Sequence, residues 1–210
     1  MRTITPEELK TILENHLHWL REDCDGWENM RADLSDCDLS GASLDYASLN
    51  YASLNRASLN YASLNGASLN GASLNGASLN RASLNYASLN GASLNGAKNV
   101  PFIPYSCPDC GSFIGYKKAS GYIVELEILS DSRRLSATDR KCRCDKAKVL
   151  SIQNIDGTKA EINSVASSYD EKFLYKVGEI VKVENFDEDR FNECSTGIHF
   201  FINRQEAVDY

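Results

Sequence analysis

A short repeat dominates the sequence and limits what the chain can fold into. From Ala32 to Gly96 one five-residue unit occurs thirteen times in succession, mostly as Ala-Ser-Leu-Asn followed by a variable residue. A fixed short period is typical of a solenoid, in which each unit packs only against its neighbours. Near-identical units offer few groups for chemistry, so the sequence indicates an architecture more clearly than an activity.

Each unit combines a short extended segment with a corner. Ala and Leu are two positions apart, so both side chains point to one side of the segment and Ser points to the other. The last two residues form the corner. Asn-Gly accepts the positive φ of a tight turn more readily than Asn-Tyr or Asn-Arg does. We therefore expect mixed corners, of type II at Gly66 and nearer type I at Tyr51 and Arg56.

Four units form a coil of about 20 residues, and backbone pairing spaces successive coils by roughly 4.8 Å. The leucines then stack along the axis, each contributing about 2 kcal/mol on burial. Ordering the backbone offsets most of that gain, so we expect the stack to be stable only when both ends are covered. The predicted core residues are Leu34, Leu39, Leu44, Leu49, Leu54, Leu59, Leu64, Leu69, Leu74, Leu79, Leu84, Leu89 and Leu94.

The units resemble those of the pentapeptide-repeat family. Ala32-Asp33-Leu34, Cys37-Asp38-Leu39 and every later Ala-Ser-Leu match the small and large inward positions of that family. The resemblance implies a right-handed quadrilateral β-helix over residues 32–97. It covers about a third of the chain and implies almost nothing about activity.

Residues 1–31 predict a helix and an entry segment before the repeat. Thr5-Pro6-Glu7-Glu8 is a capping box with proline at the first helical position, and apolar residues follow at helical spacing up to about Glu22. Because stacked repeats need covered ends, we interpret this helix as a cap; a docking helix for a partner is the alternative. His16 and His18 are expected on the surface of the helix or at its margin.

Residues 98–210 have the composition of an α+β domain of unknown function. Alternating polar and apolar residues predict a hairpin around Ala119-Ser120-Gly121. The other expected elements are strands over residues 146–155, 173–177, 179–183 and 198–202, and a last helix after Asn203. This segment resembles an uncharacterised domain found after pentapeptide repeats in bacterial and phage proteins, through stretches such as Gly111-Ser112-Phe113-Ile114-Gly115. That family has no assigned activity to carry over.

Composition favours a cytoplasmic protein without a cofactor. No hydrophobic run is long enough to span a membrane, and the first residues lack the apolar core of a signal peptide. Seven cysteines are an odd number, which argues for a reducing compartment. The net charge of −7 is spread along the chain, so we do not expect a nucleic-acid partner.

Four cysteines are a candidate structural zinc site: Cys107, Cys110, Cys142 and Cys144. Zn²⁺ binds four thiolates tetrahedrally, and two close pairs across a hairpin provide them. The second pair, however, has one intervening residue where zinc ribbons usually have two. We therefore expect these four cysteines to be thiols that bind no metal.

A basic stretch follows the first of these pairs and opposes only Asp139 and Asp145. Such a charge excess can bind a phosphate, a nucleic-acid backbone or an acidic protein, although a solvated loop and strand face is commoner. The residues are Arg133, Arg134, Arg140, Lys141, Arg143, Lys146 and Lys148.

Aromatic and basic residues at the corners are a candidate interaction surface. With four corners in each coil, Tyr46 and Tyr86 share one edge with Gly66 between them, and Arg81 lies one coil above Tyr61. The full set is Tyr46, Tyr51, Tyr61, Tyr86, Arg56 and Arg81. Such a patch suits a protein contact, and solvent-facing filling is the alternative.

No catalytic residue is assigned. Cys194 and His199 suggest a nucleophile and base, but the apolar neighbours of His199 favour a structural histidine. We therefore predict a non-enzymatic scaffold or interaction module with an unknown protein partner. One alternative is a DNA mimic that acts on DNA gyrase, and another is a nucleic-acid-binding or enzymatic activity in residues 98–210.

Overall fold

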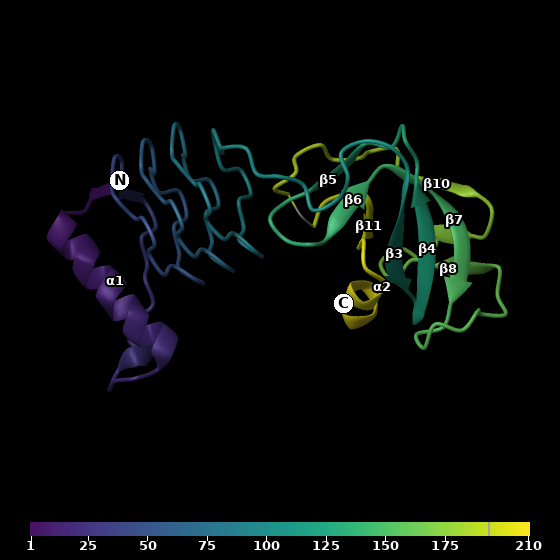
Figure 1. Ribbon diagram of the computed structural model, residues 1–210, viewed down its shortest axis with the longest axis horizontal. Coiled ribbons are helices and arrows are strands. Elements are labelled where there is room, and N and C mark those ends of the chain that lie inside the picture. Colours follow the sequence, from purple (N-terminus) through teal and green to yellow (C-terminus); the bar gives the residue numbers. More distant parts are fainter. Residues whose placement is uncertain (193) are drawn as a thin grey trace. The chain divides into compact units, whose positions relative to one another are not determined.

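The computed structural model describes residues 1–192 and 194–210 and divides into two compact units, Met1–Pro104 and Tyr105–Tyr210. The protein is mainly β with few helices. In the first unit the elements are β1 (Arg2–Thr3), α1 (Pro6–Arg21), the short 3-10 helix η1 (Trp27–Asn29), β2 (Cys37–Asp38) and the repeat coils (Figure 1). None of the helices among the described residues is both long and apolar enough to span a membrane.

The repeat forms stacked coils of four units each. Parallel bridges join residues twenty positions apart, from Asp33 with Ser53 to Ser78 with Lys98. In one such pair the Leu44 N–H donates to the Ser63 carbonyl at 2.7 Å, and the Ser63 N–H donates to the Ala42 carbonyl at 2.9 Å. The backbone of each coil is therefore satisfied by its neighbours, as a β-helix requires.

The inside of the coils is apolar. Twelve of the thirteen predicted core leucines are buried, and Leu84 in the last coil is half-buried. Most of the alanines two positions before them are buried too. The strict five-residue period places these side chains one above another because every unit turns the chain by the same amount.

Hydrogen bonds between Ser and Asn side chains reinforce the outside of the coils, which the sequence reasoning did not anticipate. Asn65 donates from its Nδ2 to the Ser63 Oγ at 2.8 Å within its own coil. Its Oδ1 accepts from the Ser83 Oγ at 2.5 Å and from the Asn85 N–H at 3.1 Å in the next coil. One side chain thus ties two coils together, and the pattern recurs along the stack.

The expectation of mixed corner types is wrong. The variable residue has a positive φ at every corner, whether it is Gly66 (65°), Tyr51 (62°) or Arg56 (56°). Each of these residues donates its N–H to a carbonyl of the coil above, as Tyr51 does to Asn70 at 2.8 Å. Pairing between coils requires one uniform backbone, and this requirement overrides the local preference of the side chain.

The second unit has three antiparallel sheets. The largest has the order β10-β7-β4-β3, the second β11-β6-β5 and the smallest β8-β9, and α2 (Arg204–Asp209) packs against β3 (Figure 1). The strands are β3 (Phe113–Ala119), β4 (Tyr122–Ile128), β5 (Arg134–Ser136), β6 (Cys142–Cys144), β7 (Lys146–Gln153), β8 (Ser164–Ala166), β9 (Leu174–Lys176), β10 (Ile180–Lys182) and β11 (Ile198–Phe200).

The core of the second unit lies on one face of the largest sheet. In the pairing of β3 with β4, the buried residues Ile128, Leu126 and Val124 lie opposite Phe113, Gly115 and Lys117. Ala119 lies opposite Tyr122. This alternation buries every second residue. Lys117 therefore occupies a position in the strand at which a hydrophobic side chain is expected.

Candidate functional site

Several corner side chains of the first unit lie along the edges of the coils and touch the coil above. A Cβ added to Gly66 would lie 2.7 Å from the Tyr46 ring, and one added to Gly71 would lie 2.6 Å from the Tyr51 ring. The two tyrosine rings therefore rest on glycines that leave room for them. This arrangement orders the rings and reduces the entropy that binding a partner would cost.

Basic corner residues also contact the neighbouring coil. The Arg81 guanidinium lies 5.7 Å from the centre of the Tyr61 ring. Arg56 forms a bidentate ion pair with Asp36, with its Nε and Nη2 at 2.8 and 2.6 Å from the two carboxylate oxygens. The two arginines therefore have partners within the coils.

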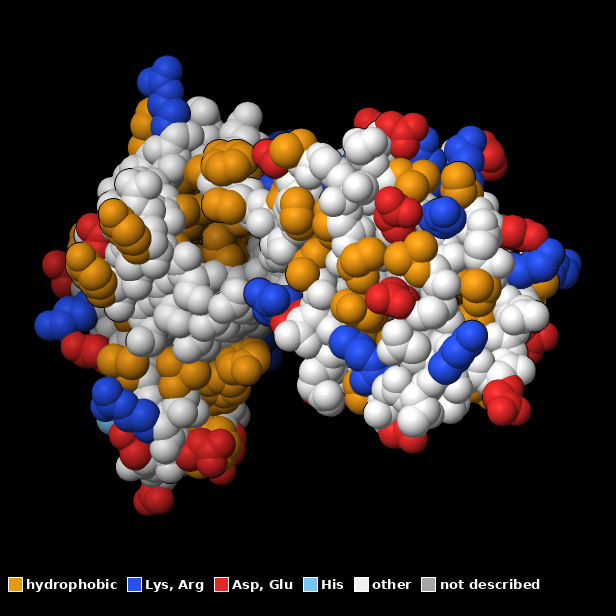
Figure 2. Space-filling model, turned by 45° about the vertical axis from the view of Figure 1, so that its right-hand side comes forward, with side chains coloured by type: hydrophobic (Ala, Val, Ile, Leu, Met, Phe, Trp, Pro, Cys, Tyr) orange, Lys and Arg blue, Asp and Glu red, His pale blue; other side chains and the backbone are white. Residues whose placement is uncertain are grey.

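The four corner tyrosines differ in how much of their surface is available. Tyr46 and Tyr86, on one edge, are 82% and 98% exposed, whereas Tyr51 is 55% exposed. Tyr51 meets Trp19 of α1 edge-on, with ring centres 6.4 Å apart, and Tyr61, which Arg81 contacts, is 59% exposed. On the face shown in Figure 2, the coils are covered mostly by backbone and uncharged polar side chains, drawn white, together with hydrophobic groups and few charges.

His16 joins α1 to the first coils and is fully buried, so the expectation of a surface histidine is wrong. The Ala32 N–H donates to its Nδ1 at 3.1 Å, and its Nε2 lies 3.1 Å from the Asn50 carbonyl. Because Nδ1 accepts, the proton is on Nε2 and the ring is neutral. Burial lowers the pKa of His16 below its usual value. Helical spacing identified this position, but only the fold supplies its two backbone partners.

The four predicted zinc ligands do not come together. Cys107, Cys142 and Cys144 are buried, while Cys110 is exposed. Of the described residues, only His18, Asp23 and Cys24 group three metal-ligating atoms closely. The Cys142 thiol donates to the Arg140 carbonyl at 3.6 Å, and its interaction with the neighbouring Cys107 thiol lowers the pKa of Cys107 and raises that of Cys142. Strand β6 places its two thiols in the hydrophobic core together with Cys107, whereas Cys110 is exposed.

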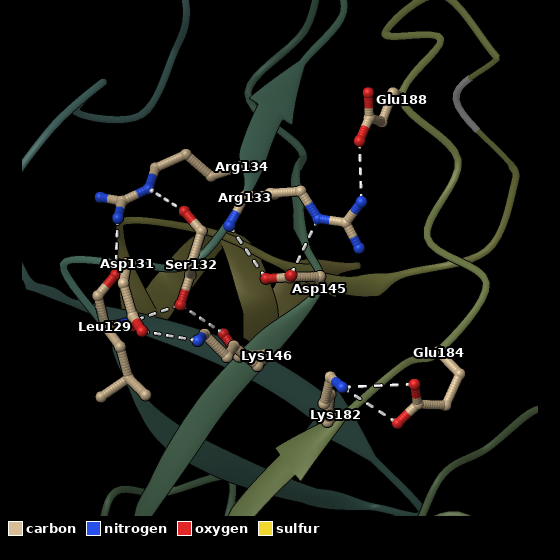
Figure 3. Close-up of polar contacts among 10 residues, drawn as sticks. All are labelled: Leu129, Asp131, Ser132, Arg133, Arg134, Asp145, Lys146, Lys182, Glu184 and Glu188. Carbon is tan, nitrogen blue, oxygen red and sulfur yellow. Dashed lines mark hydrogen bonds and ion pairs between the residues drawn. The ribbon is translucent and has the colours of Figure 1, made fainter.

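The basic stretch does not form an open cationic surface, because its side chains are used within the second unit. Arg133 pairs with Asp145 at 3.0 Å and with Glu188 at 2.7 Å, and Lys146 pairs with Asp131 at 2.7 Å (Figure 3).

The remaining cations of the stretch are held in the same way, with one exception. Arg134 donates to the carbonyl oxygens of Ser132 and Gly111, and Arg140 pairs with Glu206. Arg143 is buried beneath Phe186 and bonds two carbonyl oxygens, and Lys141 lies over the Tyr210 ring. Lys148 alone has a side chain without a hydrogen-bond or ion-pair partner in the described part of the chain.

The second unit contains a cavity of about 670 Å³ that the sequence did not indicate. Its lining comes from β3, from residues 167–175 and 182–185, and from residues 194–201. Both Cys194 and His199 line it, so the pair considered as a nucleophile and base faces the same space. A cavity of this size is within the range of small-molecule sites.

Lys117 is the most unusual residue of the cavity wall. It is 8% exposed, and its Nζ lies 5.9 Å from the centre of the buried Tyr175 ring. Desolvation lowers the pKa of Lys117 to about 8. The sequence did not mark this residue, because Lys118 follows it directly and Ile114 and Tyr116, on the opposite face of β3, are as apolar as the inward residues.

Family comparisons match both units. Residues 31–60 and 62–98 match pentapeptide repeats, and residues 103–207 match a family of unknown function, DUF5758. No match was found among curated proteins.

Solved structures similar to the chain are pentapeptide-repeat proteins. Rfr23 of the cyanobacterium Cyanothece 51142 is 34% identical, covering 30% of this chain and 44% of that one, with a TM-score of 0.30. A protein of the Arabidopsis thaliana thylakoid lumen is 29% identical over 34% of this chain and 69% of its own, with a TM-score of 0.26. HetL of Nostoc, involved in heterocyst differentiation regulation, is 41% identical over 33% and 37%, with a TM-score of 0.18. The chain spans less than half the length of Rfr23 and HetL.

Proposed function

This chain is a pentapeptide-repeat protein whose second unit belongs to the family of unknown function DUF5758, and on that premise we propose that it is a non-enzymatic scaffold whose coils bind a protein partner. Pentapeptide repeats are structural folds and are generally non-enzymatic. The observation that carries the proposal is the pair Tyr46 and Tyr86, both strongly exposed on one edge of the coils. Tyrosine is enriched in protein interfaces and among their strongest contacts.

The contacts along this edge hold an aromatic side chain in place for a partner. The Tyr46 ring rests on Gly66, which holds it flat along the coil. Gly66, which the Tyr46 ring covers, lies between the two tyrosines along the edge. The partner would therefore meet two neighbouring aromatic groups. Few charged groups surround them on the coils, so apolar contact contributes most of the affinity.

Affinity purification of the full chain tests this proposal. We expect the double variant Tyr46→Ser, Tyr86→Ser to lose the partner that the unchanged chain retains. The matched control is Asp36→Ser, Arg56→Ser, which removes an ion pair on a different edge and should retain the partner. Equal recovery of the partner by both double variants would contradict a role for the tyrosine edge.

We also propose the finer architecture: right-handed quadrilateral coils covered at their first end by α1, followed by an α+β domain. The four-unit coils and the contacts of His16 with Ala32 and Asn50 support it. A crystal structure would test the handedness of the coils directly.

A cytoplasmic location is part of the same proposal. It is supported by the seven unpaired thiols, because disulfides form chiefly in oxidising compartments. A thiol reagent applied without reductant to the protein from its own cells, after denaturation, should modify all seven cysteines. Cysteines that do not react because they form disulfides would argue against this location.

DNA mimicry is not favoured by the carboxylates of the coils. Asp36 is paired with Arg56, and Asp45 accepts hydrogen bonds from Ser63 and Asn65. Such mimicry needs a long row of free acidic groups, which this arrangement does not provide. We expect excess protein to leave DNA gyrase supercoiling unchanged; inhibition or protection of the enzyme would reverse this conclusion.

A further inference from the structure

The cavity of the second unit combines positive charge with aromatic walls. Its charged lining residues are Lys117, Lys118, Lys141 and Lys182 against Asp170 and Glu184. Three of the four lysines already have a contact: Lys118 donates to the Val208 carbonyl at 2.9 Å, Lys141 lies over Tyr210, and Lys182 pairs with Glu184.

Lys117 differs from these three. Among the described residues, no hydrogen bond or ion pair joins its Nζ to a carboxylate or a carbonyl. The Nζ lies 5.9 Å from the centre of the Tyr175 ring, and the Cys144 thiol is a further electrostatic neighbour. An ammonium that is largely desolvated and has no anion beside it is unfavourable, and replacing it with a hydrophobic residue would usually increase stability. A lysine that costs stability and lines a cavity is a candidate for function.

The rest of the lining fits a flat molecule with a polar end. Phe173, Tyr175 and Phe201 supply aromatic faces, and the hydroxyl-bearing Ser167, Ser195 and Thr196 lie at the same cavity. Aromatic walls bind planar rings by stacking, while a few polar groups fix orientation.

We propose that this cavity binds a small organic anion with a planar ring, the class that includes mononucleotides and aromatic carboxylates, and that Lys117 binds the anionic group of that ligand. The ligand would supply the negative charge that the fold withholds from Lys117. This inference is independent of the scaffold proposal, because it concerns the second unit and does not depend on the tyrosine edge.

Pyridoxal 5′-phosphate provides a chemical probe, since it has a planar ring, a phosphate and an aldehyde. The neutral amine of Lys117 adds to the aldehyde and releases water, and hydride from added borohydride reduces the imine to a stable secondary amine. The lowered pKa of Lys117, about 8, leaves far more of its amine neutral at pH 8 than the under about 1% of an ordinary lysine. Peptide mass spectrometry of the full chain should therefore show Lys117 labelled at least about tenfold faster than Lys148 in β7, which does not line the cavity.

Two reversible ligands distinguish the members of the class. We expect AMP, benzoate or both to slow the labelling of Lys117 and to give a heat of binding by calorimetry. Protection by AMP alone indicates a nucleotide site, and protection by benzoate alone a carboxylate site. Labelling of Lys117 no faster than that of Lys148, with no protection by either ligand, would overturn the proposal.

Substitution separates binding from a structural role. Lys117→Met should abolish binding of the protecting ligand and raise the melting temperature of the chain, whereas Lys148→Met should change neither. A lower melting temperature for Lys117→Met, with unchanged binding of AMP or benzoate, would show that Lys117 stabilises the fold through Tyr175 and would also overturn the proposal. The labelling of the unchanged chain remains decisive if Lys117→Met fails to fold.

Discussion

At the scale of single residues, the corners show how a neighbour in the next coil decides what a side chain does. Tyr46 and Tyr86 adopt the left-handed backbone that normally favours glycine, with φ of 57° and 59°. That conformation costs a non-glycine residue roughly 1–2 kcal/mol. At Tyr46 it is retained because the corner N–H must reach the coil above, where it donates to the Asn65 carbonyl at 2.9 Å. The identity of the corner residue therefore matters chiefly for what it places on the next coil.

Gly66, the glycine that the Tyr46 ring covers, provides a test of this view. Gly66→Ala and Gly91→Ala introduce the same strain, at φ of 65° and 66°, but only Gly66 lies against a tyrosine ring. We expect each change to lower the free energy of unfolding by about 1 kcal/mol through strain. Gly66→Ala should cost about 0.5–1 kcal/mol more, since it displaces the Tyr46 ring. Chemical denaturation of the full chain measures both.

A double-mutant comparison provides the control for that experiment. In a Tyr46→Ser background the extra cost of Gly66→Ala should disappear, which leaves it equal to Gly91→Ala. An extra cost that persists without the tyrosine ring would mean that Gly66 is required for another reason.

At the scale of elements, one histidine connects α1 to the coils. His16 satisfies the backbone N–H of Ala32 and the carbonyl of Asn50, and Trp19 stacks on its ring at 5.3 Å. The Arg31 guanidinium lies over the same Trp19 ring. Its positive charge lowers the pKa of His16 further. The attachment of the helix therefore depends on a neutral imidazole.

This dependence predicts acid sensitivity. The pKa of His16 is lower in the folded chain than in the unfolded one, so the stabilisation is complete above about pH 6.5 and declines as the pH falls below that value. The free energy of unfolding should fall by at most about 1.4 kcal/mol per pH unit from this group. Thermal melts between pH 7 and pH 5 measure the effect.

His16→Gln is the matched control for that experiment. The amide of Gln can donate to the Asn50 carbonyl and accept from the Ala32 N–H, but it does not titrate. We expect this variant to fold and to lose the part of the pH dependence that His16 contributes, while His16→Leu leaves both backbone groups unpaired and destabilises the chain at every pH. An unchanged pH profile in His16→Gln would exclude His16 as the titrating group.

At the scale of the whole molecule, the chain combines a unit of interchangeable repeats with a unit of unique contacts. Every coil has the same backbone, so its stability depends mainly on the number of neighbouring coils. The second unit instead depends on particular pairs such as Arg133 with Asp145. Changes in repeat number should therefore be tolerated, and their main effect should be on which corners align.

Insertions after Gly76 test this. Four extra Ala-Ser-Leu-Asn-Gly units add one coil and keep Tyr86 on the edge of Tyr46, while one extra unit moves Tyr86 to the edge of Tyr51. We expect both chains to fold, with a higher melting temperature for the longer one. Circular dichroism melts measure stability, and affinity purification should show that the single-unit insertion weakens partner binding more. Loss of folding after the single-unit insertion would show that the four sides of the coil are not equivalent.

How far the sequence predicted the molecule differs between its two units. Leucines spaced by five residues indicated the inside of the coils, and the capping box placed the start of α1 at Pro6. The short strands β5, β6 and β8 were missed because each lies in a polar or charged stretch, whereas the equally short β9, β10 and β11 have further apolar residues beside them. The candidate sites show the same difference. The twenty-residue length of a coil predicted that Tyr46 and Tyr86 share an edge, but nothing in the local sequence indicated the cavity around Lys117.

The sequence alone determined the period, the inward leucines and the edges on which corner residues align, since each follows from counting along a uniform coil. Only the tertiary structure decided the left-handed corners, the burial of His16, the burial of three of the four candidate zinc ligands and the pairing of the basic stretch. These depend on which groups meet across long sequence distances. Hydrogen bonding and desolvation at such meetings outweigh the preference of any residue taken singly.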